Sequence, residues 1–448
     1  MRSRGRTDVA AGRSWQVQAA LAGIGIFVGS YDLGAVSVAF APLRGQWHLS
    51  SAVVTTLGTA TLAGMLVGSL VTGVLADRFG RRGLLLFDFA LFALASAVSA
   101  LAPDFAVLAA SRLLTGGAVG MDFSVVFPYV AEQAPTGRRG RTMAWIMWAA
   151  NFGTLAAYGL GAVFLRVAPA DGWRLSLGLG VVLAFPVLLV RRRLDESPQW
   201  HVARLPDVRS IVQQARRQLR PHRMGARAAA TFLYQVGDQG LGLVLPLLLT
   251  TVLATSAASG AASATAVKAI TIPAAALTVI GIDSIGRHRL QVVGFAGRAV
   301  AFGALGVLLL VVGRRTAAVV GGLLAAGYFF GAAGPDKTTV IVPAESSPTE
   351  VRSTSQGISQ ASGRLGGIVG VTLYGVLASL GGPGAGVLLF AGAALLGVVV
   401  SAVQSARGAP DARPALPARQ GGRSGEPLAA VGVSQVSQVP SAHDRCLE

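Results

Sequence analysis

The stretch GVLADRFGRR at residues 73–82 decides the fold of this chain, because it returns in altered form as GIDSIGRHR at residues 281–289. Each copy follows one long apolar run, precedes another, and joins an acid to basic residues through a glycine turn. A second set repeats at nearly the same offset, with Glu132, Pro135, Thr136 and Arg139 returning as Glu345, Pro348, Thr349 and Arg352. Two unrelated motifs that repeat at about half the chain length indicate a duplicated unit. Duplicated halves made of several apolar helices are typical of transporters, with the substrate site between the halves.

The composition indicates a polytopic membrane protein. Of 448 residues, 52% are hydrophobic and only 13% are charged, which is too apolar for a soluble chain of this size. The net charge of +18 would suggest a nucleic-acid partner in a soluble protein. Here we interpret it as loop charge on one side of a membrane, and we expect no nucleic-acid partner. The single cysteine, Cys446, excludes an intrachain disulfide.

Apolar runs long enough to cross a bilayer recur along the whole chain. We expect an all-α membrane protein in which two pseudo-symmetric six-helix halves, residues 16–191 and 225–406, flank an arginine-rich loop at 192–224. Residues 1–15 would form a short N-terminal segment, and residues 407–448 a disordered tail. The twelve expected spans lie near residues 16–42, 51–76, 84–102, 106–132, 142–166, 173–191, 225–253, 260–282, 290–312, 316–343, 354–380 and 384–406.

Arginine clusters predict the orientation. They fall in alternate connections, at residues 78–82, 138–141 and 191–223, which the positive-inside rule assigns to the cytoplasm. Both termini would then be cytoplasmic in a multi-pass protein of the cell membrane. Arg314 and Arg315 fall in one short loop on the other side and are an exception.

Charged residues inside the apolar runs are the strongest functional signal. Each costs roughly 2.5–3.5 kcal/mol at the bilayer centre, so we expect most of them to line a wet cavity or to pair. Lys268 and Lys337 are the only lysines in the chain, and both lie inside such runs. The interior charges are Asp32, Arg112, Asp122, Asp238, Lys268, Arg298, Asp336, Lys337 and Arg364.

The repeated turn resembles the signature between helices two and three of the Major Facilitator Superfamily. In that superfamily the turn holds the two halves together in the outward-facing state. The resemblance covers residues 16 to about 406 and implies gating roles for residues of both motif copies: Gly73, Asp77, Arg78, Gly80, Arg81, Arg82, Asp283, Gly286, Arg287, Glu132, Arg139, Glu345 and Arg352.

Other strings point to branches within the superfamily. DGWR at residues 171–174 and ESPQW at 196–200 resemble sugar porters, whereas residues 343–366 resemble the phosphate:proton symporters and nearby metabolite:proton symporters. Asp32 and Asp122 sit where the latter branch carries functional carboxylates. The chain departs from that branch at Tyr234-Gln235 and at Asp336-Lys337, and an extra acid near a phosphate would repel it.

These patterns predict the site residues. Arg112 and Gly116 match a superfamily motif linked to proton coupling, and we expect Asp32, Asp122 and Arg112 to couple protons. Neighbouring helical residues diverge by about 100° and cannot simply pair, so we expect Lys337 to face the cavity and contact an anion, with Asp336 tuning it or carrying a proton. Pro335 just before them removes a backbone N–H and can locally open the helix. The substrate-binding candidates are Tyr31, Phe123, Tyr234, Gln235, Asp238, Asp336, Lys337 and Arg364.

No nucleotide-binding loop, catalytic signature or metal-ligand spacing occurs in the sequence, so we expect no enzyme activity, no cofactor and no metal. The leading hypothesis is a monomeric secondary transporter that imports a small polar metabolite with protons: an organic acid, a sugar-like compound or phosphate. Drug or metabolite:proton antiport is the alternative within transport. A non-transporting membrane sensor is the alternative of another class.

Overall fold

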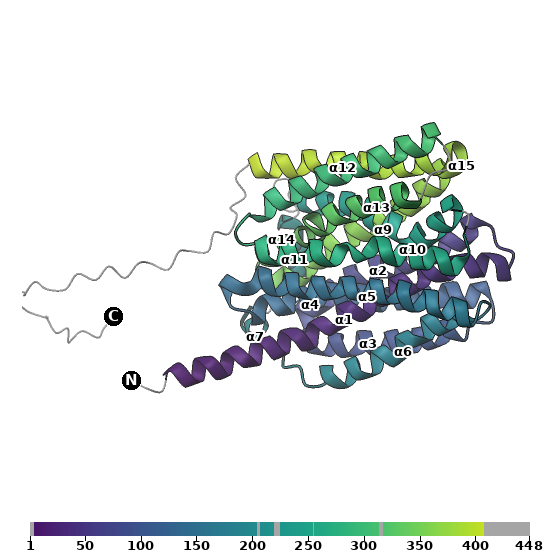
Figure 1. Ribbon diagram of the computed structural model, residues 1–448. Helices are drawn as coiled ribbons and strands as arrows, with labels where there is room; N and C mark the ends of the chain where they lie inside the picture. The colour runs from purple at the N-terminus through teal and green to yellow at the C-terminus, as the bar shows by residue number, and fades with distance from the viewer. Residues whose placement is uncertain (1–3, 204–206, 219–224, 254, 313–316, 407–448) are drawn as a thin grey trace, which may run out of the picture. The chain divides into compact units, whose positions relative to one another are not determined.

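The computed structural model describes residues 4–203, 207–218, 225–253, 255–312 and 317–406, and its described elements are helices. The expected tail at 407–448 and the exceptional Arg314 and Arg315 lie outside these residues. In Figure 1 the helices run nearly parallel across the view, with those of residues 4–191 (purple to blue) below most of those of residues 226–406 (green to yellow).

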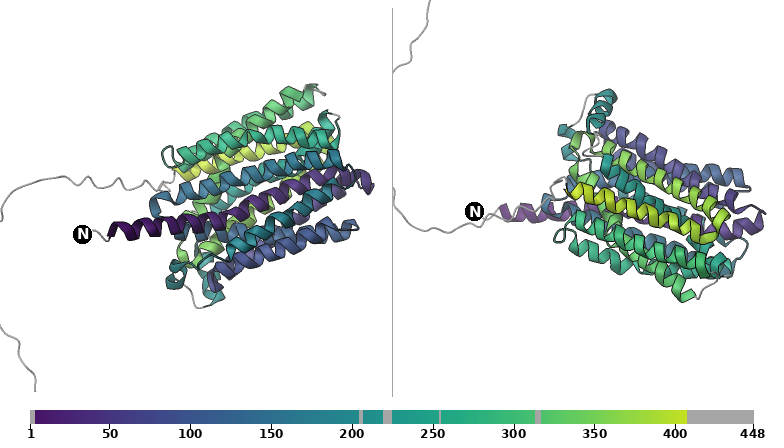
Figure 2. Two further views of the ribbon diagram at one scale, coloured as in Figure 1. Left: turned by 60° about the horizontal axis from the view of Figure 1, so that its bottom comes forward. Right: turned by 90° about the horizontal axis from the view of Figure 1, so that it is seen from above.

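The two halves have the same build. The first contains α1 (Arg4–Gln46), α2 (Ser51–Phe79), α3 (Arg82–Ala100), α4 (Phe105–Gln133), α5 (Arg139–Val167) and α6 (Gly172–Arg191). The second contains α9 (Ala226–Leu253), α10 (Ala257–Ala269), α11 (Thr271–Gly281), α12 (Arg287–Val312), α13 (Ala317–Ala332), α14 (Pro335–Ser346) and α15 (Arg352–Ala406). Short 3₁₀ turns, η1 (Thr136–Arg138) and η3 (Thr349–Val351), precede α5 and α15. The two views of Figure 2 show the same set of parallel helices from other sides.

Eleven helices in the described part of the chain are long and apolar enough to cross a membrane. The last of them is interrupted within α15, where Gly381 and Gly382 leave the helical conformation and Gly382 takes φ 76°. Glycine alone adopts such a φ without strain, and Pro383 directly after it cannot continue a helical hydrogen-bond ladder. The break divides α15 into two crossings, in agreement with the expected twelve spans.

Two expected spans each divide into two helices. The run at 260–282 changes from α10 to α11 at Ile270, which keeps helical φ and ψ, and the run at 316–343 is broken at Gly334 between α13 and α14. A proline follows each of these positions: Pro273 in the first turn of α11 and Pro335 at the start of α14. Because proline lacks a backbone N–H, the carbonyl one turn earlier loses its helical partner.

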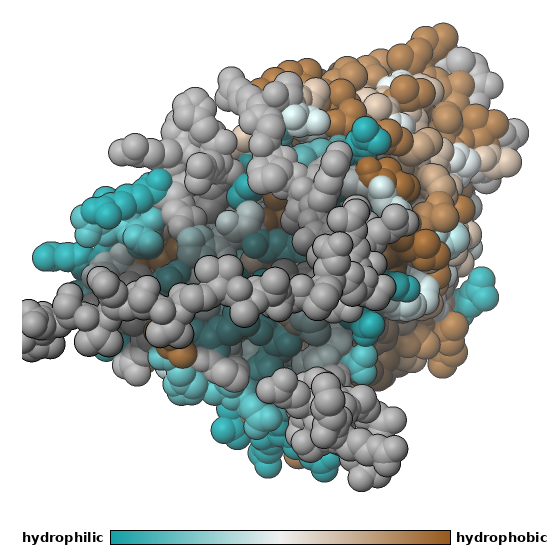
Figure 3. Space-filling model, turned by 90° about the vertical axis from the view of Figure 1, so that its left-hand side faces the viewer, coloured by the Kyte–Doolittle hydropathy of each residue, from teal (hydrophilic) through white to brown (hydrophobic). Residues whose placement is uncertain are grey.

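The halves approach closely at the end that carries the arginine clusters. A Cβ atom on Gly73 of α2 would lie 2.7 Å from the carbonyl oxygen of Ser353 in α15. Only glycine permits this separation, so α2 and α15 meet backbone to backbone. Figure 3 views this end of the molecule and shows hydrophilic residues gathered on it, with hydrophobic residues along the flank.

The connection between the halves contains α7 (Pro198–Ala203) and α8 (Val208–Gln218). The α8 segment buries Ile211 and Ala215 on one face and exposes arginines on the other. At its start, the Asp207 carboxylate accepts the Ser210 backbone N–H at 2.6 Å, and this hydrogen bond lowers the pKa of Asp207.

Candidate functional site

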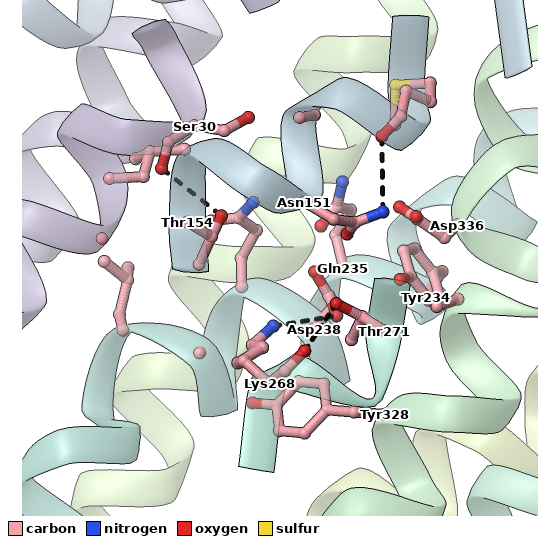
Figure 4. Close-up of a pocket in the computed structure, with 18 of the residues that line it drawn as sticks. Ser30, Asn151, Thr154, Tyr234, Gln235, Asp238, Lys268, Thr271, Tyr328 and Asp336 are labelled. Carbon is pink, nitrogen blue, oxygen red and sulfur yellow. Dashed lines mark hydrogen bonds and ion pairs between the residues drawn. The ribbon is translucent and has the colours of Figure 1, made fainter. Parts of the chain in front are cut away.

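A cavity of about 90 Å³ lies between the two halves. Its walls come from α1, α4 and α5 of the first half and from α9, α10, α11, α13, α14 and α15 of the second. Figure 4 shows polar side chains from both halves pointing toward one another across it. The lining residues are Ser30, Leu33, Gly34, Phe123, Met147, Ala150, Asn151, Thr154, Tyr158, Tyr234, Gln235, Asp238, Gln239, Gly242, Leu243, Lys268, Thr271, Tyr328, Ala332, Asp336, Val340, Gln360 and Arg364.

Arg364 is the cation in this wall that has the least compensation. Its side chain is 1% exposed, and among the described residues its one hydrogen bond runs from a terminal nitrogen to Gln360 Oε1 at 3.4 Å. The guanidinium carbon lies 4.9 Å from the centre of the Phe123 ring. Among the described residues no carboxylate lies within ion-pair distance of Arg364, and its Nε, Gln360 Nε2 and Gln235 Oε1 have no hydrogen-bond partner. A buried guanidinium without an anion is costly unless a ligand supplies one.

Asp238 is surrounded by cations. Lys268 Nζ lies 4.0 Å and an Arg298 terminal nitrogen 3.6 Å from one of its oxygens. The Lys268 ammonium also sits 3.8 Å from the centre of the Tyr328 ring, while the Arg298 guanidinium lies over Tyr234 at 4.8 Å. This cluster therefore carries one more positive than negative charge.

The Asp336-Lys337 pair differs from the expectation. Asp336 lines the cavity, whereas Lys337 is fully buried, is not among the lining residues, and forms an ion pair with Asp336. The two residues occupy the first turn of α14 directly after the break at Gly334. There the long lysine side chain folds back to pair with the adjacent Asp336. The sequence analysis assumed a regular helix, in which adjacent side chains diverge and do not pair.

The expected proton-coupling residues form two separate buried clusters in the first half. In the first, an Arg112 terminal nitrogen donates to both Asp32 oxygens at 2.9 and 3.0 Å, and Ser99 and Thr115 accept the remaining guanidinium protons. Tyr31, next to Asp32, donates to the Ser176 carbonyl at 2.9 Å and does not line the cavity.

In the second cluster, Asp122 pairs with Arg191 at 2.6 Å, and Asp88 pairs with the same guanidinium at 3.2 Å. All three side chains are at most 3% exposed. Arg112 thus faces Asp32, and a different arginine serves Asp122. Sequence reasoning missed Asp88 and Arg191; the available signal was an acid inside the apolar run 84–102 and an arginine at the last turn of α6.

The first copy of the repeated turn joins the two halves. Asp77 accepts the backbone N–H groups of Ser353 and Thr354 at 3.1 and 2.7 Å, so it caps the first turn of α15. Arg81 bridges Asp77 and Glu132 at 3.2 and 2.9 Å.

The network extends on both sides. Arg352 reaches Glu132 at 3.2 Å, and Gly80 turns the chain with φ 103°. Glu196 accepts the N–H groups of Arg81 and Arg82. This arrangement, the first latch (Asp77, Arg81, Glu132 and Arg352), is almost entirely buried.

The second copy is less engaged. Arg287 pairs with Asp283 at 3.2 Å and with Glu345 at 3.0 Å, and Gly286 takes φ 94° in the turn between them. The Asp283 side chain is 35% exposed, against 0% for Asp77. Arg139, which corresponds to Arg352, donates to the Ala134 carbonyl at 3.2 Å. No capping bond from Asp283 to α5 is present among the described residues.

Several lining residues were not anticipated from the sequence. Asn151 and Thr154 of α5, and Ser30 of α1, point into the cavity without any motif around them. Small polar residues in apolar helices carry no signal that separates a cavity wall from a helix contact. Gln360 lay within a motif, but the motif did not indicate which of its residues face inward.

Comparisons with known proteins agree with this architecture. The model of the family described as "Sugar (and other) transporter" matches residues 17–210 and again 207–404. The putative niacin/nicotinamide transporter NiaP of Bacillus subtilis is 29% identical over 80% of this chain and 88% of its own length. The arabinose-proton symporter of the same organism is 32% identical over 40% of each chain.

Solved structures share the fold. The xylose transporter XylE from E. coli, in a partially occluded inward-open conformation, superposes with a TM-score of 0.73 at 18% identity and covers 89% of this chain and 99% of its own. The human organic anion transporter MFSD10 superposes with a TM-score of 0.71, also at 18% identity, over 86% and 99%. With a family model that matches both halves and a fold shared with Major Facilitator transporters, this chain belongs to the sugar (and other) transporter family as a multi-pass membrane transporter.

Proposed function

We propose that this protein imports a small organic anion together with protons, by alternating exposure of the central cavity. The observation that carries the proposal is Arg364, a buried guanidinium in the cavity wall whose terminal nitrogen has one 3.4 Å hydrogen bond and no acid partner among the described residues. A carboxylate accepts two parallel bonds from such a group. Gln235 and Gln360 have unpartnered amide atoms beside it, and Phe123 offers an aromatic face.

The charge of the cavity wall supports an anion. Arg364 and Lys268 line the cavity, Arg298 pairs with Asp238 from outside the lining, and Asp336 is neutralised by Lys337. The surplus is positive, so an anionic substrate lowers the electrostatic cost of the closed state. The relative NiaP is named for niacin, a small carboxylate, and for its neutral amide.

Proton coupling is proposed to act through Asp32 and Asp122. Each is buried against one arginine, so a shift in helix position would change the balance between burial and ion pairing that holds it charged. The latches at the arginine-rich end would govern which side is open. Because one chain supplies both walls of the cavity, we infer a monomeric working unit, located in the cell membrane.

A neutral sugar is the second candidate, favoured by the amide and hydroxyl groups of Asn151, Thr154 and Gln235 in the wall and by relatives named for arabinose and xylose. Proteoliposome uptake of nicotinate and nicotinamide tests charge directly, since the two share one ring. D-xylose serves as the neutral sugar.

We expect uptake of nicotinate to exceed that of nicotinamide and xylose and to require an inward proton gradient. Removal of one charge-assisted contact costs about 1.5–3 kcal/mol, so Arg364→Gln should weaken nicotinate binding by about 10- to 100-fold. It should leave binding of any neutral ligand nearly unchanged. If the protein instead prefers xylose and Arg364→Gln leaves substrate binding unchanged, the substrate is a neutral sugar and not an anion.

A further inference from the structure

A second hollow lies on the surface, outside the central cavity. It is a groove of about 1070 Å³ between α1 and α5. It is open to the surroundings, since Ile24 and Trp145 in its walls are 45% and 47% exposed. Its lining residues are Trp15, Gln16, Ala19, Ala20, Gly23, Ile24, Phe27, Gly137, Arg138, Arg141, Thr142, Trp145, Ile146, Ala149 and Asp283.

The groove is built from one face of each helix. Residues 16, 19, 20, 23, 24 and 27 of α1, and residues 138, 141, 142, 145, 146 and 149 on the η1–α5 side, recur at intervals of three and four. Small residues of α1, including Ala19, Ala20 and Gly23, form the floor. Trp15 and Trp145 flank it, as tryptophan does at the level of lipid headgroups.

Polar and apolar groups are separated along the groove. Arg138 and Arg141 stand exposed at its entrance, where the apolar span of α5 begins at Arg139. Among the described residues neither guanidinium forms an ion pair. Asp283 lies at the rim, but Arg287 pairs with it at 3.2 Å. Beyond Thr142 the α5 wall is apolar, through Trp145 and Ile146 to Ala149.

We propose that this groove binds one anionic phospholipid. Its phosphodiester would lie between Arg138 and Arg141, and one acyl chain would lie on Ala20, Ile24 and Ala149. From Arg141 to Ala149 the groove extends about 12 Å along α5 at 1.5 Å per residue, within the roughly 15 Å of one leaflet. The groove thus presents charge at headgroup depth and a slot at acyl-chain depth, the order in which a phospholipid presents its parts.

The net charge favours an anionic headgroup. Two arginines oppose one aspartate that is already paired, so the entrance is positive. Arginines near an anionic membrane surface contribute about 1 kcal/mol each, which is about fivefold in affinity per residue. A zwitterionic headgroup would bring an ammonium group toward two arginines and gain less.

Native mass spectrometry of the purified full chain, with phosphatidylglycerol or phosphatidylcholine added to the detergent, tests the proposal. Arg138→Gln/Arg141→Gln removes the headgroup contacts, and Ala20→Trp fills the slot at an exposed position. The matched controls are Arg192→Gln/Arg193→Gln, two exposed arginines at the same end of the molecule, and Ala90→Trp, an exposed alanine on α3.

We expect a retained phosphatidylglycerol adduct that falls about 30-fold in the double arginine variant, from about 2 kcal/mol for two arginines, and is lost in Ala20→Trp. The controls should bind like the wild type. Equal retention of phosphatidylcholine, or a groove variant that binds like its control, would overturn the proposal. Binding of inorganic phosphate at millimolar concentration in the absence of lipid would also overturn it, because it would indicate a site for free anions. A dimer that is lost in Ala20→Trp would assign the groove to a second copy of the chain.

Discussion

The two buried acid–arginine clusters of the first half differ in charge balance. Arg112 faces one carboxylate, that of Asp32, and the pair is neutral. Arg191 faces two, those of Asp88 and Asp122, so the cluster is negative by one charge when both acids are ionised. Removal of one member should therefore have opposite consequences in the two clusters, because an uncompensated buried charge is what destabilises a protein interior.

For Asp32 the prediction concerns coupling. Asp32→Asn removes a group that can bind and release a proton, so substrate accumulation at an imposed pH gradient should fall to the level seen without a gradient. Exchange of labelled for unlabelled substrate should survive. Asp104→Asn is the matched control, because Asp104 is an exposed helix cap whose carboxylate accepts the Val107 N–H, and the asparagine amide oxygen can accept the same bond. Normal accumulation in Asp32→Asn would remove it from the coupling mechanism.

For Arg191 the prediction concerns stability. Arg191→Gln leaves two buried carboxylates without a cation and should cost about 3–5 kcal/mol, seen as a large fall in the thermal midpoint of the detergent-solubilised protein. Asp88→Asn leaves one acid facing one base, and its midpoint should stay close to that of the wild type. A larger fall in Asp88→Asn than in Arg191→Gln would contradict this charge balance.

For Lys337 a double-mutant cycle separates binding from stability. Lys337→Gln leaves Asp336 uncompensated in the cavity wall, so it should both destabilise the protein and weaken binding of an anion by repulsion. Asp336→Asn/Lys337→Gln restores neutrality and should recover most of the thermal midpoint. If anion affinity in the double variant stays as low as in Lys337→Gln, then Lys337 contacts the substrate itself, as the sequence suggested.

At the residue scale, the sequence identifies which ionisable residues are costly to place in a membrane, but it does not show which of them pair. Asp32, Asp122 and Arg112 stand out because ionisable groups are rare in apolar runs. Their pairing depends on helix rotation and packing, which a single chain does not reveal. Arg191 was assigned to a loop edge, although the last turn of α6 carries it into the interior.

At the scale of elements, the first latch holds α2 against α15 by capping one helix with a carboxylate from another. Asp77→Ala removes that cap, worth about 1 kcal/mol or more, together with the partner of Arg81. We expect the conformational equilibrium to shift by about tenfold toward opening at the arginine-rich end. Turnover should fall with little change in substrate affinity.

Accessibility labelling of single cysteines on either side of the cavity, in a Cys446→Ser background, measures that shift. Asp283→Ala is the comparison variant, because Asp283 makes no cross-half cap among the described residues, and it should change labelling less. Normal turnover with lost substrate binding in Asp77→Ala would instead assign Asp77 to the site.

The spans themselves could be predicted, since length and hydropathy suffice to recognise a membrane helix. The change of helix at Ile270 could not, whereas Pro335 indicated that the helix can open locally next to Gly334. Pro273 and Pro335 were visible, but a proline inside a membrane helix either kinks it or is accommodated by its neighbours, and only the packed structure decides between these outcomes.

For the whole molecule, the duplication predicted the architecture and the location of the cavity between the halves. The charge content of that cavity was predicted in part, through Asp238, Asp336 and Arg364. The identity of its uncharged wall was not, because Asn151, Thr154 and Ser30 differ from other small polar residues only in the direction in which they point.

The unequal burial of Asp77 and Asp283 has a consequence for the resting conformation of the carrier without substrate. Two halves of common origin have kept the same turn, yet in this state Asp77 caps a helix of the opposite half, whereas Asp283 caps none among the described residues. With the arginine-rich end in the cytoplasm, as the charge distribution predicts, the clamped side faces the cell interior. An empty carrier biased in this way rests ready to meet solute outside, and it limits backward leakage of what the cell has already gathered.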